Sequence, residues 1–343
     1  MKRAWRRAAR AVGGALFAVG LLTGGGLAGA TGAPGVLRWA TFRHVTQVVD
    51  LTARRADGSI VVAADGSLSL LHPDGTVTRF ARGPQGYSTA RGPEPYLTIT
   101  TAQPVGGTTC TFPTDGIDAI QPGAHPAVIA VDPSGRARRL AELPPGVAPN
   151  GIAYDTVGSF GHRLLVTAAT NHTTELFAID CTGRATPITT TAPTVEGGMI
   201  VAPSAFGPFG GDLIAPDENR GLVWALDPGG AAHLVVDSGL RHGGDIGVES
   251  AGFVPPGFAA DWVAYLADRV SPGNPHPGTD HILRLTGAAL LATGVRAGDL
   301  LVASEGGAAT ITVRCTPTCR ARHVADGPPV SHGEGHLVVV PPR

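Results

Sequence analysis

The chain has 343 residues, of which 15% are charged and 43% are hydrophobic, and its formal net charge is −1 with histidine neutral. Five of the 26 basic residues lie in the first ten positions and no acidic residue lies in the first 30, so the remainder carries a net charge of −6. An acidic balance of this kind argues against nucleic acid as a partner.

Residues 1–30 have the pattern of a secretory signal peptide. Basic residues precede an apolar, glycine-rich stretch from Ala11 to Leu27, and the small residues Ala28-Gly29-Ala30 follow. We predict cleavage after Ala30, which leaves a single secreted domain, residues 31–343, with no membrane span. The alternative is an uncleaved anchor whose apolar stretch crosses the bilayer.

The hairpin pattern that recurs along the chain is an apolar run, a turn rich in Asp, Pro and Gly, and a second run with outward-facing Arg or Thr. The six copies are 68–82, 127–143, 176–189, 222–236, 282–294 and 311–325. Their turn glycines include Gly75, Gly135, Gly183, Gly230 and Gly287, which are 47 to 60 residues apart. This spacing is typical of the four-stranded blades of a β-propeller.

Two further strands precede most copies of the hairpin. The apolar runs 60–64, 164–167, 212–216, 262–267 and 299–304 are candidate second strands. The candidate innermost strands begin at Glu94, Asn150, Glu196, Glu249 and Glu334. We therefore predict an all-β fold, a six-bladed β-propeller whose N- and C-terminal segments close one blade.

The ends of the chain suggest how the ring closes. The first hairpin, 68–82, shows no innermost strand before it, whereas the last innermost strand has no hairpin after it. We expect these two segments to combine in one blade. The sixth blade, 299–325, lacks a clear innermost strand, so a five-bladed or irregular ring is the alternative.

Four cysteines fit two disulfide bonds in an oxidising compartment. Cys315 and Cys319 can close a tight hairpin, which leaves Cys110 to pair with Cys181. The alternative, a metal site, normally requires closely paired cysteines, and two of these four stand alone.

Polar residues recur at the same offset in the innermost strands, and equivalent positions of a ring converge on its axis. The predicted ligands of a divalent cation, with Ca²⁺ favoured by an all-oxygen set, are Glu94, Asn150, Glu196, Glu249 and Glu334. Because strand side chains alternate, we expect Tyr96, Tyr154 and His336 to line the same channel. We expect His332, His242 and Asp245 to reach the same mouth from the loops that enter these strands. The alternative is structural, with the acids capping strand ends and pairing with Arg or His.

The segment Pro149-Asn150-Gly151-Ile152-Ala153, at the start of an innermost strand, is similar to one in the SMP-30/gluconolactonase/strictosidine synthase-like superfamily. The resemblance implies a six-bladed fold with one axial divalent metal, held in lactonase members by an Asn, a Glu and an Asp. Asn150 matches the Asn ligand of that family, and Glu334 or Glu94 matches the Glu ligand. No innermost strand opens with Asp-Gly, so Glu196 or Glu249 would replace the Asp.

The resemblance further implies metal-assisted hydrolysis of a lactone, with Glu249 or Glu196 as the catalytic base. The alternative function is a non-catalytic extracellular module that binds a glycan, peptide or protein. In either case we expect a monomer that takes a small-molecule or glycan ligand.

Two other segments carry weaker signals. His332-Gly-Glu334-Gly-His336 has spacing that would place three possible zinc ligands on one face of a strand; the alternative is two histidines flanking a channel carboxylate. Residues 268–280 form a Pro/Gly-rich insertion, which we predict to be a rim loop that covers the pocket or a solvated connector.

Overall fold

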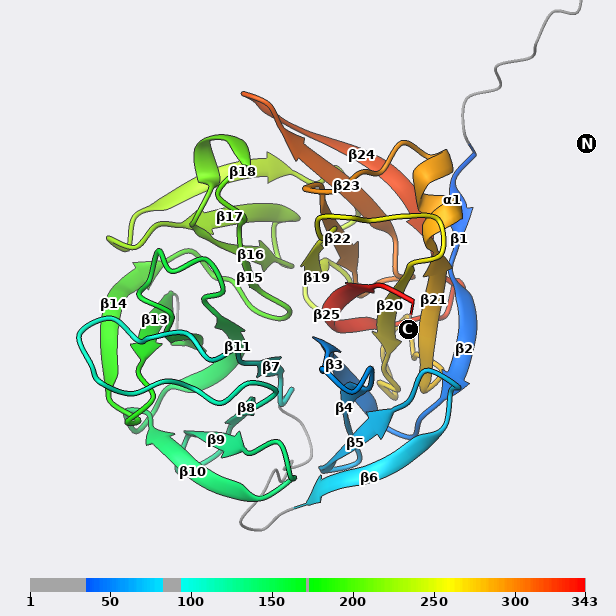
Figure 1. The fold of residues 1–343 in the computed structure, drawn as a ribbon. Coiled ribbons are helices and arrows are strands. Elements are labelled where there is room, and N and C mark those ends of the chain that lie inside the picture. The colour runs from blue at the N-terminus through cyan, green and yellow to red at the C-terminus, as the bar shows by residue number, and fades with distance from the viewer. Residues whose placement is uncertain (1–34, 83–93, 171–172, 343) are drawn as a thin grey trace, which may run out of the picture. The chain divides into compact units, whose positions relative to one another are not determined.

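The computed structural model describes residues 35–82, 94–170 and 173–342, and in this part of the chain six sheets, antiparallel but for one added strand, form a ring (Figure 1). The innermost strands contact one another around the axis in the order β3, β7, β11, β15, β19 and β25, which returns to β3. The predicted six-bladed β-propeller is confirmed. The predicted signal peptide, 1–30, lies outside the described residues.

Four consecutive blades are each built from four strands in chain order, from the axis outward. The first two consist of β3 (Val48–Arg54), β4 (Ile60–Ala64), β5 (Ser67–Leu71) and β6 (Val77–Arg82), then β7 (Leu97–Ile99), β8 (Ile117–Gln121), β9 (Ala127–Val131) and β10 (Ala137–Glu142). The third and fourth consist of β11 (Ala148–Tyr154), β12 (Leu164–Ala169), β13 (Thr174–Ile179) and β14 (Ala185–Ala192), then β15 (Ile200–Val201), β16 (Leu213–Asp217), β17 (Leu222–Leu226) and β18 (Ala232–Asp237).

The last two blades interleave in sequence. The fifth contains β19 (Val248–Phe253), β22 (Leu300–Ser304), β23 (Thr310–Cys315) and β24 (Cys319–Asp326), with β1 (Leu37–Arg38) added in parallel. Between β19 and β22 the chain forms β20 (Val263–Asp268) and β21 (His281–Thr286) of the sixth blade, which β25 (Gly333–Val340) completes on the inside and β2 (Ala40–His44) on the outside.

The ends of the chain therefore close one blade, as predicted, but it is not the expected blade. Hairpin 68–82 already has its own innermost strand, β3, and the C-terminal β25 pairs with β20 instead. The blade predicted to lack an innermost strand receives β19, so the five-bladed alternative is wrong.

Segment 282–294 is not a hairpin. After β21 the chain forms a short helix, α1 (Gly287–Ala292), whose first turn is capped by Thr286 Oγ1, which accepts from the Ala289 amide at 3.2 Å. Alanine and leucine favour helix and threonine is a good N-cap, so local propensity exceeds the turn signal of Gly287. A 3-10 turn, η1 (Gly207–Phe209), lies between β15 and β16. No helix among the described residues is long and apolar enough to cross a membrane.

The blades pack face to face through apolar side chains. Ile120 and Val128 of the second blade share a buried cluster with Ile152 and Leu164 of the third. Each such side chain stabilises the fold by about 1.5–3 kcal/mol when fully buried. The turn glycine Gly183 has φ +90°, and a Cβ there would lie 1.9 Å from the Leu140 carbonyl oxygen of the preceding blade. Close blade packing thus depends on this glycine.

Both predicted disulfides are present. Cys110 lies in the loop after β7 and bonds to Cys181 in the β13–β14 turn, which links the second and third blades. Cys315 and Cys319 bridge the ends of β23 and β24 and close that hairpin.

Candidate functional site

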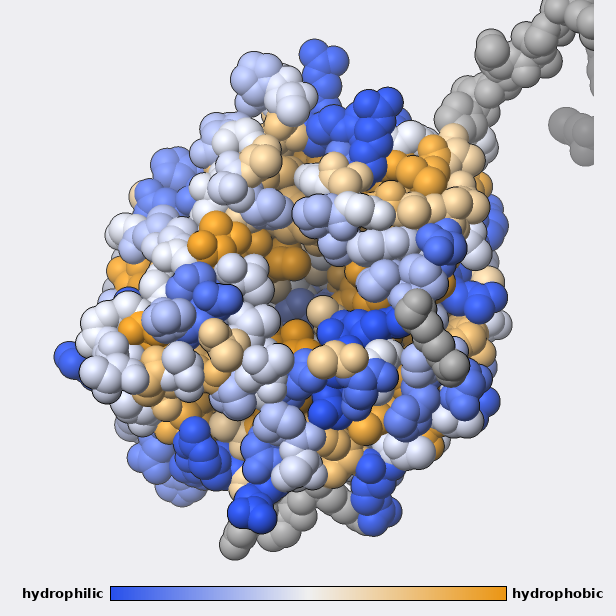
Figure 2. All heavy atoms as spheres, in the orientation of Figure 1, coloured by the Kyte–Doolittle hydropathy of each residue, from blue (hydrophilic) through white to orange (hydrophobic). Residues whose placement is uncertain are grey.

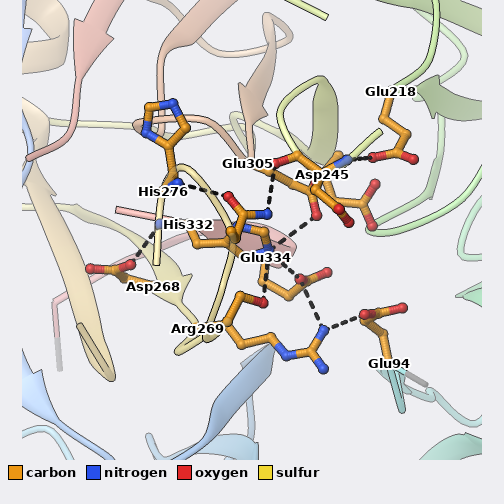
Figure 3. Close-up of polar contacts among 12 residues, drawn as sticks. Glu94, Glu218, Asp245, Asp268, Arg269, His276, Glu305, His332 and Glu334 are labelled. Atoms are coloured by element: carbon orange, nitrogen blue, oxygen red, sulfur yellow. Dashed lines mark hydrogen bonds and ion pairs between the residues drawn. The ribbon is translucent and has the colours of Figure 1, made fainter. Parts of the chain in front are cut away.

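One mouth of the ring gathers acidic side chains because of strand direction. The innermost strands begin at this mouth, and the second strands, which are antiparallel to them, end there. Glu249 and Glu334 lie near the starts of β19 and β25, whereas Glu218 and Glu305 directly follow β16 and β22. Two layers of strands therefore supply carboxylates to the same end of the axis (Figure 3).

Glu196, Glu218 and Glu249 form the first group, here called the carboxylate triad. One oxygen of each lies within 4.8 Å of the others. Glu218 Oε2 accepts from the Asp245 amide at 3.0 Å, and the ion pairs of the described residues leave all three acids without a Lys, Arg or His partner. The triad therefore concentrates negative charge that the surrounding side chains do not neutralise.

Burial and repulsion both act on the protons of this triad. Burial, and then the charge of Glu218, raise the pKa of Glu196 to about 8. Burial, and then the charge of Glu196, raise the pKa of Glu249 well above its usual range. Glu249 is 2% exposed and its Oε2 has no hydrogen-bond partner among the described residues. Oxygens in this situation bind protons or a cation.

Asn150 lies beside the triad through its backbone. Its carbonyl oxygen accepts from the Gly197 amide at 2.9 Å, next in sequence to Glu196. The side-chain amide donates to the Val195 carbonyl at 3.1 Å, while the buried Oδ1 has no partner in the described part of the chain. A second unsatisfied oxygen thus lies at this end of the axis.

Glu305, His332 and Glu334 form the second group, here called the paired cluster. His332 Nε2 lies 3.2 Å from Glu305 Oε1 and 3.5 Å from Glu334 Oε2. Burial acts to lower the pKa of His332, but the hydrogen bonds to Glu305 and Glu334 outweigh it and raise the pKa to about 10. Burial raises the pKa of Glu305 to about 9, opposed by the bond to His332. The histidine is therefore a fixed cation at neutral pH.

Arg269 adds a second cation to the paired cluster. It directly follows β20 and contacts Glu94, while its Nη1 lies 3.4 Å from Glu334 Oε2. Burial acts to raise the pKa of Glu334, yet the hydrogen bond from His332 and the charge of Arg269 hold it below its usual range. Glu334 is thus an ionised carboxylate although it is fully buried.

Tyr96 links the two groups. Its hydroxyl lies 2.6 Å from Glu249 Oε1 and also contacts Glu334 Oε1. A hydroxyl has one proton, so it can donate to only one of two carboxyls and must accept from the other. Because the pKa of Glu334 is lowered and that of Glu249 is raised, Tyr96 donates to Glu334 and Glu249 retains its proton in the metal-free protein.

Further along the axis from the acidic mouth, the innermost strands come into backbone contact. The Gly198 amide donates to the Glu249 carbonyl and the Gly198 carbonyl accepts from the Ala251 amide, both at 3.0 Å. A Cβ at Gly198 would lie 2.2 Å from the Gly335 carbonyl oxygen, and one at Gly252 would lie 1.7 Å from that of Leu337. The innermost strands of the last three blades are therefore in backbone contact across the axis.

Two predicted channel residues lie beyond this backbone contact. His336 Nδ1 binds the buried Asp50 at 2.9 Å and its Nε2 faces the Met199 carbonyl at 3.0 Å, while the Tyr154 hydroxyl donates to the Thr101 carbonyl at 2.9 Å. Both line an apolar cavity of about 130 Å³ at the other ends of the innermost strands. The face in Figure 2 is hollowed near the axis, with hydrophobic residues along part of the hollow.

Strand irregularities explain why these two predictions misplaced the side chains. The register of β11 shifts between Pro149 and Gly151, and that of β20 against β25 shifts where Gly335 has φ +68°. A bulge interrupts the alternation of faces on which the prediction relied. The three-residue zinc arrangement is not formed, because His336 lies apart from His332 and Glu334.

The other predicted residues do come together at the acidic mouth. Glu196 and Glu249 lie in the triad, and Tyr96 connects them to Glu334 and His332. Glu94 reaches Glu334 through Arg269. Of the loop residues, Asp245 contributes its backbone amide, whereas exposed His242 packs beside Gly221.

Sequence reasoning missed Glu218, Arg269 and Glu305. Each is the first residue after the second strand of its blade, namely β16, β20 and β22. They lie two, two and one residues beyond the predicted runs 212–216, 262–267 and 299–304, so the residues just after these runs were the signal that could have revealed them. It also missed Asp50 because β3, with the sequence VVDLTAR, lacks the polar opening of the other innermost strands.

The insertion 268–280 lies at the acidic mouth, as expected for a rim loop. Asn274 Nδ2 donates to the Asp245 carbonyl at 3.1 Å, and His276 Nδ1 lies 2.7 Å from the Pro329 carbonyl. Ser271 Oγ lies 3.5 Å from His332 Nε2. The loop is therefore tied to both neighbouring loops of the mouth.

No family model and no curated protein sequence matches this chain. Similar solved structures include a catalytically inactive virginiamycin B lyase from Staphylococcus aureus with quinupristin, at 11% identity, covering 88% of this chain and 94% of that one, TM-score 0.46. A gluconolactonase from Xanthomonas campestris is 13% identical, covering 71% and 86%, TM-score 0.37. The Dos1 propeller is 10% identical, covering 81% and 60%, TM-score 0.44. The sheet topology itself identifies residues 35–342, where described, as a six-bladed β-propeller.

Proposed function

We propose that the carboxylate triad binds a divalent cation, with Ca²⁺ preferred, in a secreted metal-assisted hydrolase of the lactonase type. The observation that carries the proposal is that three carboxyls lie within 4.8 Å of one another without a cationic partner, although Arg269 and His332 neutralise the acids beside them. Oxygen donors from carboxylates are the ligands that Ca²⁺ prefers.

The donor set fits such an ion. Glu196, Glu218 and Glu249 would hold it, and the unsatisfied Glu249 Oε2 and Asn150 Oδ1 are oxygens that lack any other partner among the described residues. Glu94 and Glu334, which the sequence suggested as ligands, already interact with Arg269. Glu218 takes their place in the proposed set.

A bound divalent ion polarises a substrate carbonyl and lowers the pKa of bound water. The chain's own residues supply the proton path. Tyr96 joins Glu249 to Glu334, which His332 and Arg269 hold ionised, so the proton that Glu249 gives up when an ion binds can pass to the Tyr96 hydroxyl while that hydroxyl gives its own proton to Glu334. Glu196 and Glu218 are only partly buried, which leaves the triad accessible to a substrate.

The proposed location outside the cytoplasm rests on the signal-like residues 1–30 and the two disulfides, which persist in oxidising compartments. Proteins with this fold perform many functions, so the site has to carry the argument.

The test is elemental analysis of the purified protein dialysed against Ca²⁺, followed by acid release from a panel of lactones. We expect one tightly bound ion in the wild type and in Glu142→Gln, an exposed acid-to-amide control, and none in Glu218→Gln. Lactone hydrolysis should be present in the wild type and in Glu142→Gln, which bind the ion, and absent in Glu218→Gln. Failure of the wild type to bind any divalent ion would overturn the proposal. A bound ion without lactone hydrolysis would overturn the proposed enzymatic activity and favour the alternative, a non-catalytic binding module.

A further inference from the structure

The outer hairpin of the fifth blade presents an unusual face of arginine and threonine. Along β23 and β24, Thr312 is the cross-strand partner of Arg322 and Arg314 is the partner of Arg320. These four line a groove of about 620 Å³, together with Thr316, Pro317, Thr318 and Ala321 at and beside the hairpin end that the Cys315–Cys319 disulfide closes.

The positive charge of this face is only partly neutralised. Arg314 is paired with Asp299, with Nη2 to Oδ2 at 2.6 Å and Nε to Oδ1 at 2.7 Å. The exposed Arg320 and Arg322 form no ion pair with an acid among the described residues; Arg322 instead donates to the Thr293 carbonyl at 2.5 Å. Three arginines thus stand against the one carboxylate of Asp299, and a bound anion would neutralise part of the remaining positive charge.

A buried hydroxyl in the same groove lacks a partner. Thr312 is 5% exposed, and its Oγ1 makes no hydrogen bond within the described part of the chain. A buried hydroxyl without a partner is unfavourable unless a ligand or water supplies one. This observation is independent of the charge of the arginines and concerns the same face.

We propose that this groove binds a small organic molecule through a phosphate or sulfate group, with Arg320 and Arg322 on the oxyanion and the Thr312 hydroxyl as a further donor. Guanidinium groups recognise tetrahedral oxyanions through paired, charge-assisted hydrogen bonds. The volume of the groove is in the range of small-molecule sites and exceeds the need of a free ion, which favours an anion on a sugar-sized carrier.

The groove belongs to the two outer strands of the blade, whereas the acids belong to the two inner strands. The proposal therefore stands independently of the axial metal and of lactone hydrolysis. An acid-lined mouth repels anions, so the arginine face of the outer strands is the more favourable place for one.

The test is calorimetric titration of the full protein with a hexose phosphate, the same hexose without phosphate, inorganic phosphate and inorganic sulfate. We expect saturable binding of the hexose phosphate, weaker binding of the free ions and none of the plain hexose. Arg320→Gln and Arg322→Gln should each weaken binding about tenfold, and Thr312→Val about threefold.

Arg136→Gln is the matched control, since Arg136 is an exposed arginine in the β9–β10 hairpin of another blade. Its binding should equal that of the wild type, and circular dichroism should show all variants folded. The proposal is overturned if none of the anions binds saturably. It is equally overturned if binding survives in Arg320→Gln and Arg322→Gln, or falls as much in Arg136→Gln.

Discussion

The carboxylate triad and the paired cluster lie at the same mouth, and each contains buried acids, yet they differ in whether cationic side chains neutralise those acids. In the paired cluster His332 and Arg269 supply cations from the chain itself, so Glu334 stays ionised. In the triad the described residues supply none, and the pKa values of Glu196 and Glu249 rise instead. Glu305, which contacts His332 but not Arg269, still has a pKa that burial raises to about 9. The comparison indicates that a carboxyl buried this deeply stays ionised when two cations act on it, as they do on Glu334.

The largest effect should come from removing the internal cation. His332→Ala leaves Glu305 and Glu334 buried without their shared partner, and breaking a buried ion pair in this way costs about 4 kcal/mol. Urea unfolding at neutral pH measures this loss. His233→Ala, which removes an exposed partner of Asp227, is the control and should change stability by less than about 1 kcal/mol. A loss from His332→Ala no larger than the control's would show that the cluster is not held together by charge.

Asp118 offers a third case for comparison, because it is a buried acid that belongs neither to the carboxylate triad nor to the paired cluster. It is 2% exposed, its Oδ1 lacks a partner among the described residues, and burial raises its pKa to about 7. A folded-state pKa above the unfolded value of 3.8 means that stability from this group is present below about pH 4 and is lost as the pH rises to about 7.

We therefore expect Asp118→Asn to be more stable than the wild type by about 3–4 kcal/mol above pH 7, with the difference vanishing near pH 4. Urea unfolding at both ends of this range gives the two values. A gain that is independent of pH would mean that ionisation of Asp118 is not its cause.

Cation binding to the triad should depend on pH in a defined direction. In the metal-free protein Glu196 binds its proton up to about pH 8, and that proton must leave before the carboxylate can bind an ion. Ca²⁺ affinity should therefore increase as the pH rises through about 8, and the proton of Glu249, whose pKa is also raised, must leave as well. Titration calorimetry in buffers of different ionisation enthalpy measures the affinity and the protons released. Binding without proton release would contradict the raised pKa values.

The smallest expected effect is a gain in stability from Glu196→Gln, opposite in sign to the loss expected from His332→Ala. Glu196→Gln removes an acid from the uncompensated group, so in chelated protein at neutral pH we expect a gain of about 1 kcal/mol after allowance for its partial exposure. Urea unfolding in the presence of chelator measures it. A loss comparable to that of His332→Ala would mean that the two groups do not differ as described.

The sequence was sufficient for the blades because their signals are local. Turn glycines such as Gly135 and Gly183 have the positive φ that their hairpins require, so five of the six predicted hairpins are present. The order of the last two blades was not predictable in this way. Whether β25 pairs with β20 or with β4 depends on long-range packing, and Thr286 with the Ala-Leu segment after it forms a helix where a turn glycine suggested a hairpin.

The site was predicted in part for a similar reason. Equivalent positions in the innermost strands located Glu196, Glu249 and Glu334 at one mouth. Strand alternation added Tyr96 correctly, but bulges redirected His336 and Tyr154. Glu218 and Arg269 come from the ends of second strands, and which of them faces which acid is set by the loops. Charge compensation is a property of the assembled mouth, so the sequence pattern alone did not separate the two groups of acids.

The most direct test of this account is the thermal unfolding temperature of the wild type and of Glu218→Gln, each with chelator and with saturating Ca²⁺. An ion that binds only the native state raises that temperature. The account predicts a rise with Ca²⁺ in the wild type and none in Glu218→Gln, because the triad is the group that lacks a cation of its own. No rise in the wild type, or an equal rise in the variant, would contradict it.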